Sequence, residues 1–166
     1  MPAPRRMMMA AAGRPTGQAY RYFKLNISDN NGHAQTTVGE LKIFAGATDY
    51  PVETMTSNVL PSPLVASASA EYSNDKAWKA FDNDIVGDYW RMVASSGWLK
   101  IDLGAGNDIV PTEYKITGLD SSNPTLNPKD WTFEGSVDDV SWDVLSTETR
   151  TSWGHRVEFT YAVTPV

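Results

Sequence analysis

The chain of 166 residues contains no cysteine. Disulfide bonds, thiolate zinc sites, iron–sulfur clusters and cysteine nucleophiles are therefore excluded, because each of them needs a cysteine sulfur. Apolar residues make up 41 % and aromatic residues 11 % of the chain, which is typical of an ordered globular protein. The length suits one domain with a sizeable core.

Long apolar runs are also missing. The longest, Met7–Ala12, has six residues, whereas a membrane-spanning helix needs about 20 and the apolar part of a signal peptide about 7–15. Arg5 and Arg6 resemble the start of a twin-arginine export signal, but the run that follows them is too short for one. We therefore predict no membrane partner and no secretion signal.

Basic residues are outnumbered by acidic residues over most of the chain. Residues 1–17 carry three arginines and no acid, while the remaining 149 residues have eleven bases against twenty acids, a net charge of −9. An acidic domain repels phosphate backbones and lacks the cationic surface that nucleic-acid binding requires. The charge distribution therefore excludes nucleic acid as a partner.

Residues 1–18 have no sustained hydrophobic period and many small residues, which predicts a non-globular basic arm before a domain at residues 19–166. Two roles stay open for this arm: a frayed terminus, or an anchor to a partner through residues 1–17. Three adjacent methionines, Met7–Met9, favour the anchor, since their side chains adapt to irregular apolar surfaces.

Apolar and polar residues alternate in several short segments, as in half-buried β-strands. The alternating apolar residues are Phe23, Leu25 and Ile27, then Leu41 and Ile43, then Leu99, Ile101 and Leu103. Further strands are expected at 114–119, 130–136, 141–147 and 156–163, and turn-rich pieces separate them. This pattern predicts an all-β antiparallel sandwich or barrel.

Helical content is predicted to be small. A single short helix is expected at Asp75–Ala80, with Asn74 or Asp75 as its N-cap. Residues 45–65 contain three prolines and no strong period, so we interpret them as a long surface connection.

Several motifs resemble the discoidin or coagulation factor 5/8 type C family. In chain order they are Ser67–Ser69, Ala77–Asp84, Tyr89–Trp90, Gly97–Gly104, Pro128–Ser136 and Ser141–Trp142. The resemblance implies a galactose-binding-domain-like jelly-roll sandwich. In the turn after Ser136, Asp139 stands where the family usually has glycine, and aspartate tolerates the positive φ that such a turn needs.

The segments Tyr20–Leu25 and Val38–Gly46 are similar to the strand pair that commonly closes such domains, but here they open the domain. A sandwich whose termini lie close together tolerates such a permutation. The same arrangement is similar to that in bacteriophage tail and fibre proteins. This resemblance implies a virion surface location, other virion proteins as partners through residues 1–17, and multimeric assembly.

Acidic residues on one loop predict a structural calcium site. Asp82, Asp84 and Asp88 lie close together in the sequence, and calcium prefers six to eight oxygen ligands. The family resemblance adds Glu40, because a glutamate at the matching strand position often joins this site. The alternative is that Asp82 only accepts backbone hydrogen bonds in the turn.

By the same resemblance, loops at one end of the sandwich hold a glycan. The candidate ligand-binding residues offer aromatic faces and amide or guanidinium donors, and they are Tyr72, Asn74, Arg91, Asn123, Asn127 and Trp153. Trp153 is expected to be a solvent-facing platform for a sugar ring or a lid on the sandwich, and a conformational role stays open for Asn123 and Asn127.

The other tryptophans are assigned by their place in the strand pattern. The core is expected to contain Trp90, Trp98, Trp131 and Trp142, whereas the burial of Trp78 stays open.

Catalytic motifs are absent from the sequence. His33 and His155 lack metal-ligand spacing, and no nucleophile elbow or phosphate-binding loop occurs. Twenty acidic residues form many carboxylate pairs, so counting them does not decide whether the protein hydrolyses glycosides.

We predict a non-enzymatic module of a phage virion that binds bacterial surface glycans. The alternative is a structural virion protein that uses the same fold for protein contacts and binds no sugar.

Overall fold

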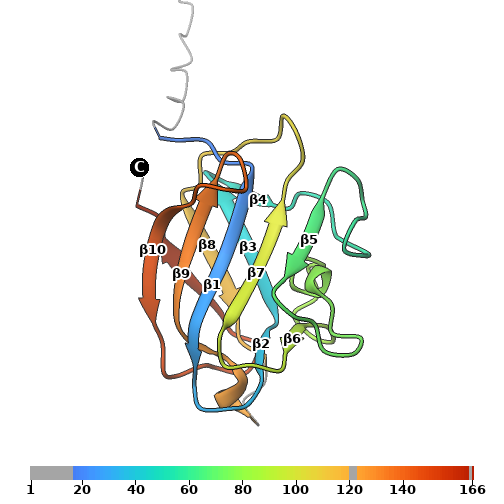
Figure 1. The fold of residues 1–166 in the computed structure, drawn as a ribbon, viewed down its shortest axis with the longest axis vertical. Helices are drawn as coiled ribbons and strands as arrows, with labels where there is room; N and C mark the ends of the chain where they lie inside the picture. Colours follow the sequence, from blue (N-terminus) through green and yellow to red (C-terminus); the bar gives the residue numbers. More distant parts are fainter. Residues whose placement is uncertain (1–16, 120–122, 165) are drawn as a thin grey trace, which may run out of the picture.

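The computed structural model describes residues 17–119, 123–164 and 166, which form an all-β antiparallel sandwich (Figure 1). The first sheet has the strand order β10-β9-β1-β7-β5, the second has the order β11-β8-β3-β4, and a small β2-β6 sheet lies at one end (Figure 1). The first sheet contains β1 (Tyr22–Asn30), β5 (Val65–Ala68), β7 (Gly97–Asp102), β9 (Pro128–Ser136) and β10 (Asp143–Thr149). The others are β2 (Thr36–Val38), β3 (Glu40–Ala45), β4 (Thr48–Tyr50), β6 (Trp90–Met92), β8 (Glu113–Thr117) and β11 (Glu158–Ala162).

The core lies between the two sheets and is built by the predicted alternation. Leu25 pairs with Leu99 on β7 and with Phe133 on β9, and all three side chains are fully buried. Tyr114 of β8 stacks on Phe133 with ring centroids 4.1 Å apart, which joins the second sheet to the first. Leu99, Ile101 and Leu103 are all buried. The prediction of an all-β sandwich is confirmed.

The sequence pattern did not predict the shortest strands. Residues 45–65 contain β4, which pairs with β3, so the expectation of a strand-free connection is wrong. The sequence also gave no sign of β2 and β6. Strands of three residues complete less than two periods of alternation, so their hydrophobic pattern cannot be distinguished from that of a loop.

The predicted helix at Asp75–Ala80 is instead a 3₁₀ turn, η1 (Ala77–Ala80), whose N-cap is Lys76. The caps expected at Asn74 or Asp75 are wrong, because Glu71 Oε1 accepts the hydrogen bond from the Ala77 N–H at 2.8 Å. A second 3₁₀ turn, η2 (Pro124–Leu126), lies beyond the single helix that we predicted. Neither turn is long enough to bury a helical face.

The tryptophans divide between the core and the outer face. Trp90 and Trp131 are buried as expected, and Trp78 packs at the edge of the core. Trp98 and Trp142 are only half-buried, which corrects the prediction for both. Lys24 Nζ lies 3.9 Å from the centroid of the Trp142 ring, so the ring forms a cation–π contact with the Lys24 ammonium group.

The loops gather at the two ends of the sandwich. At the end with β2 and β6, Thr36 Oγ1 donates to Ala94 O at 2.7 Å and the Asn31 N–H donates to Asn127 O at 3.2 Å (Figure 1). At the other end, the Gln18 N–H donates to Val166 O at 3.2 Å, so the two ends of the described chain are adjacent. The predicted arm, apart from Gly17 and Gln18, lies outside the described residues.

Among the residues described, no helix has the length and apolar character needed to cross a membrane.

Candidate functional site

Arg91 is the centre of a cluster that combines aromatic rings with charge. Its Nη2 lies 2.6 Å from Asp75 Oδ2, in an ion pair that lacks hydrogen-bond geometry. The guanidinium carbon lies 4.5 Å from the centroid of the Tyr72 ring and 5.5 Å from that of Tyr89. We call Tyr72, Asp75, Tyr89 and Arg91 the Arg91 cluster.

Local backbone pairing holds this cluster together. The Tyr72 N–H donates to Arg91 O at 2.8 Å, and the Arg91 N–H donates to Asp75 O at 3.3 Å. A tight turn joins Tyr72 to Asp75, with Ser73 at a φ of +52°. The turn therefore lies against β6 like an extra strand and fixes the Tyr72 ring over the guanidinium.

Two features of the Arg91 cluster point outward, toward a ligand. Tyr72 is 41 % exposed, and Asn74 at the tip of the turn is exposed. The Arg91 side chain is 24 % exposed, while its Nε is buried and has no hydrogen-bond partner among the described residues. Partly desolvated guanidinium donors next to an aromatic face suit ligands that carry hydroxyl or carboxylate oxygens.

Asn127 takes a structural part rather than the predicted ligand-binding one. It is fully buried, its Oδ1 accepts a hydrogen bond from the Leu119 N–H at 2.9 Å, and its Nδ2 donates to Pro124 O at 3.2 Å. Both ends of the amide are therefore occupied. Asn127 fixes the η2 loop, which is the conformational role that the sequence left open.

Asn123 is half-buried and has a similar local bond. Its Oδ1 accepts a hydrogen bond from Thr125 Oγ1 at 2.5 Å, and its backbone forms the N-cap of η2. Tyr72, Asn74 and Arg91 come together in the structure. Asn123 instead contacts Thr125 of η2, and Asn127 contacts Leu119, Pro124 and Asn31.

Trp153 is a lid on the core and not an exposed platform. Its side chain is only 6 % exposed, and its Nε1 donates to Pro128 O at 2.8 Å. The ring packs edge-on against Phe159 at 5.4 Å and lies 6.0 Å from Trp131. The expectation of a solvent-facing Trp153 is wrong because long-range packing, which a turn-rich local sequence does not reveal, covers it.

The acidic loop is organised mainly by its own backbone. Asp84 Oδ1 accepts hydrogen bonds from the Val86 and Gly87 N–H groups at 2.7 and 3.1 Å. Asp82 Oδ1 accepts one from the Asp84 N–H at 2.9 Å, and Asp88 forms an ion pair with Lys79 at 2.9 Å. Across the described residues, no group of three or more His, Asp or Glu side chains is arranged to hold a metal ion.

Glu40, at the start of β3, is a buried carboxylate beside this loop. Only 2 % of it is exposed, and its Oε2 has no hydrogen-bond partner. Burial, reinforced by the negative charge of Asp82, raises the pKa of Glu40 to about 8, although the Asn83 backbone N–H opposes this shift. Burial also raises the pKa of Asp82, to about 6. The two carboxylates therefore disfavour each other's ionised form.

A small cavity of about 50 Å³ adjoins Glu40, and its lining residues include Asp49, Thr54 and Asn83, whose side chains contain oxygen, together with the cation Lys42. The lining thus combines a buried unpartnered carboxylate oxygen with further side-chain oxygens. This donor set has the hard-oxygen character that calcium prefers.

The sequence did not predict the contributions of Asp75, Tyr89 and Glu71. Asp75 was assigned to a helix cap, but it is the ion-pair partner of Arg91. The available signals were the opposite charges of Asp75 and Arg91 and the position of Tyr89 beside Trp90. Asp75 and Arg91 are sixteen positions apart, yet their contact depends on the turn at Ser73.

A scan against protein-family models found no match for this chain, and searches of curated proteins and of solved structures found none either.

Proposed function

We propose that this protein is a non-catalytic carbohydrate-binding and adhesion module on the surface of a phage virion. It recognises bacterial surface glycans through the Arg91 cluster, and residues 1–17 attach it to other virion proteins. The observation that carries the binding proposal is the partly exposed Arg91 guanidinium, which faces two tyrosine rings, one of them the exposed ring of Tyr72.

The chemistry of the cluster fits a sugar. The exposed part of the Tyr72 ring offers a flat apolar surface to the C–H face of a pyranose, and ordering it costs little entropy because tyrosine has few rotatable bonds. Asn74 and Arg91 supply donors for hydroxyl or carboxylate oxygens. Such a shallow site buries little area, so each copy binds weakly and many copies on one particle provide avidity.

Calcium is a proposed structural cofactor, with Glu40 and Asp82 as ligands and Asp84 and Asp88 on the same loop. The unpartnered buried Oε2 of Glu40 supports this assignment, because a buried carboxylate without a partner is costly. A bound cation would neutralise the like charges of Glu40 and Asp82 and hold the loop against β3.

The alternative function is a structural virion protein that binds no sugar. Three exposed valines on and beside the β9–β10 hairpin favour it, namely Val137, Val140 and Val144, which are 54 %, 80 % and 53 % exposed. Apolar side chains gathered on one hairpin suit a contact with another protein.

A matched pair of variants tests the glycan proposal. Arg21 also combines a tyrosine ring with an aspartate elsewhere: its guanidinium lies 4.8 Å from the Tyr22 ring centroid, and its Nε donates to Asp102 Oδ1 at 2.6 Å. The protein is displayed in many copies on a bead and applied to an array of bacterial glycans. Arg91→Ala should lose binding while Arg21→Ala keeps it.

Equal loss of binding in both variants would contradict the assignment to the Arg91 cluster. No binding by the wild-type protein on a broad array would favour the structural alternative.

A further inference from the structure

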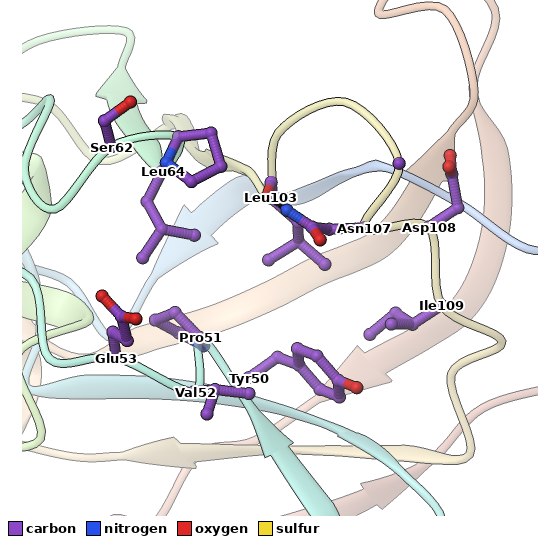
Figure 2. Close-up of a pocket in the computed structure, with 12 residues that line it drawn as sticks. Tyr50, Pro51, Val52, Glu53, Ser62, Leu64, Leu103, Asn107, Asp108 and Ile109 are labelled. Carbon is purple, nitrogen blue, oxygen red and sulfur yellow. Dashed lines mark hydrogen bonds between the residues drawn. The ribbon is translucent and has the colours of Figure 1, made fainter.

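A cavity of about 370 Å³ lies at the end of the sandwich opposite β2 and β6, between the loops that follow β4, precede β5 and follow β7. Figure 2 shows Leu64, Leu103 and Ile109 pointing into this cavity beside Tyr50. Its volume is in the range of small-ligand pockets, about 300–1,000 Å³. We call it the distal pocket, and the Arg91 cluster has no residue in its lining.

The distal pocket is apolar inside and acidic at its rim. Glu53 and Asp108 stand on opposite sides of it (Figure 2), and both are exposed. Neither forms an ion pair within the described part of the chain, and none of the twelve lining residues is basic. An occupant with apolar side chains flanked by positive charge would therefore complement it.

The chain itself contains such a segment. Residues 1–16 have three arginines, no acid and the three methionines Met7–Met9. Methionine side chains are unbranched and polarisable, so they fill irregular apolar pockets well. Arg5 and Arg6 directly precede the methionines, so positive charge and apolar side chains are adjacent in this segment.

The path of the chain brings this segment to the correct end of the molecule. Tyr20 and Ile109 exchange backbone hydrogen bonds at 2.8 and 2.9 Å, and Ile109 lines the distal pocket. The described chain begins at the end that carries the loop after β7 (Figure 1). About eight to ten residues separate Met7–Met9 from Gly17, and an extended chain of that length spans roughly 26–36 Å.

We propose that the distal pocket receives Met7–Met9 of its own chain, with Arg5 and Arg6 paired with Glu53 and Asp108. A short tether gives the segment an effective concentration near the millimolar range, which favours the chain's own pocket over that of another copy. The inference goes beyond glycan binding. In the free protein, residues 1–16 bind at the end of the sandwich opposite the Arg91 cluster. On assembly, their contact with the distal pocket is replaced by a contact with a partner protein.

Disulfide trapping in the full chain tests this contact, because the protein has no cysteine of its own. Met8→Cys is combined with Ser62→Cys, at the exposed rim of the distal pocket. The control combines Met8→Cys with Val140→Cys, which is exposed on the β9–β10 turn. That turn lies at the same end of the sandwich, since Tyr22 pairs with both Ser136 and Asp102.

The expected result is a disulfide within one chain that forms at least about tenfold faster with Ser62→Cys than with Val140→Cys. Adding Glu53→Lys and Asp108→Lys should reduce the rate to that of the control, because the arginines lose their partners. Equal rates for the two pairs would overturn the proposal, as the tether alone would explain them. A predominance of crosslinked dimers would overturn the assignment to the chain's own pocket.

Discussion

Arg91 and Arg21 occupy similar surroundings but differ in how completely their donors are used. Arg21 forms a two-pronged contact, in which Nε and Nη2 each donate to one oxygen of Asp102 at 2.6 and 2.7 Å. Arg91 forms one ion pair with Asp75, and its Nε is left without a partner. A buried donor without an acceptor costs free energy. We infer that Arg91 is the one of the two that gains from a ligand.

The Glu40 carboxylate gives a prediction for calcium. Calcium at a hundredfold excess over its Kd stabilises a folded protein by about 2.7 kcal/mol. Adding calcium should therefore raise the thermal midpoint of the wild-type protein, and chelation should lower it. Glu40→Gln and Asp82→Ala should each remove the difference, whereas Asp29→Asn, at a carboxylate whose side chain is 49 % exposed and which pairs with Lys129, should keep it. A wild-type melting curve unchanged by chelation would exclude the metal.

Glu134 gives a prediction about pH. Its two oxygens contact Lys24, Asn26 and Thr132, at 2.8, 3.1 and 2.6 Å. Burial alone would raise the pKa of Glu134, but these partners outweigh burial and lower it below 4.5. A lowered folded-state pKa adds stability that is present above the unfolded value, near 4.5, and that is lost as the pH falls through the folded value.

Glu134→Gln should therefore destabilise the protein at pH 7, and the free-energy difference from the wild type should shrink as the pH falls below about 4.5. Denaturant unfolding at several pH values measures it, with Glu53→Gln as the exposed control. A difference that stays constant down to pH 3 would show that the charge of Glu134 is not involved.

At the scale of elements, strand β7 joins the predicted pattern to the observed core. Its residues pair with β1 on one side and with β5 on the other, so Leu99 lies on an interior strand of the first sheet. The period-2 pattern predicted this burial because a central strand with one buried face repeats it over several residues. The pattern did not predict β2, β4 or β6, which are three residues long and gain their pairing from their neighbours.

Leu99→Ala should lower the free energy of unfolding by about 2–5 kcal/mol, because it leaves a cavity between the sheets. Val93→Ala, at a side chain that is 58 % exposed after β6, should change it by less than about 0.5 kcal/mol. Urea titration measures both. Similar small effects for the two variants would contradict the burial of β7.

At the scale of the whole molecule, the sandwich presents two different ends. One carries β2, β6 and η2, and the other carries the distal pocket and the adjacent ends of the described chain. Sequence motifs predicted the sandwich and brought Tyr72, Asn74 and Arg91 together as candidates. They could not place Trp153 or Asn127, since the burial of these residues depends on contacts with Phe159 and Leu119 that only the closed fold creates.

Multivalency gives a prediction at this scale. If each copy binds a glycan weakly, display of many copies on one particle should raise the apparent affinity by about 10²–10⁴ over the single chain. Surface plasmon resonance with a single-chain analyte and a bead-displayed analyte compares the two. Equal affinities would show that the sites do not act together.

The most direct test of the central claim is an NMR titration of the isotope-labelled protein with the glycan that binds best on the array. The account predicts that the largest shifts occur at the backbone amides of Tyr72 and Asn74 and at the Arg91 Nε–H, while the Arg21 Nε–H stays unchanged. Shifts confined to residues of the distal pocket, or no shift with any bacterial glycan at millimolar concentration, would contradict it.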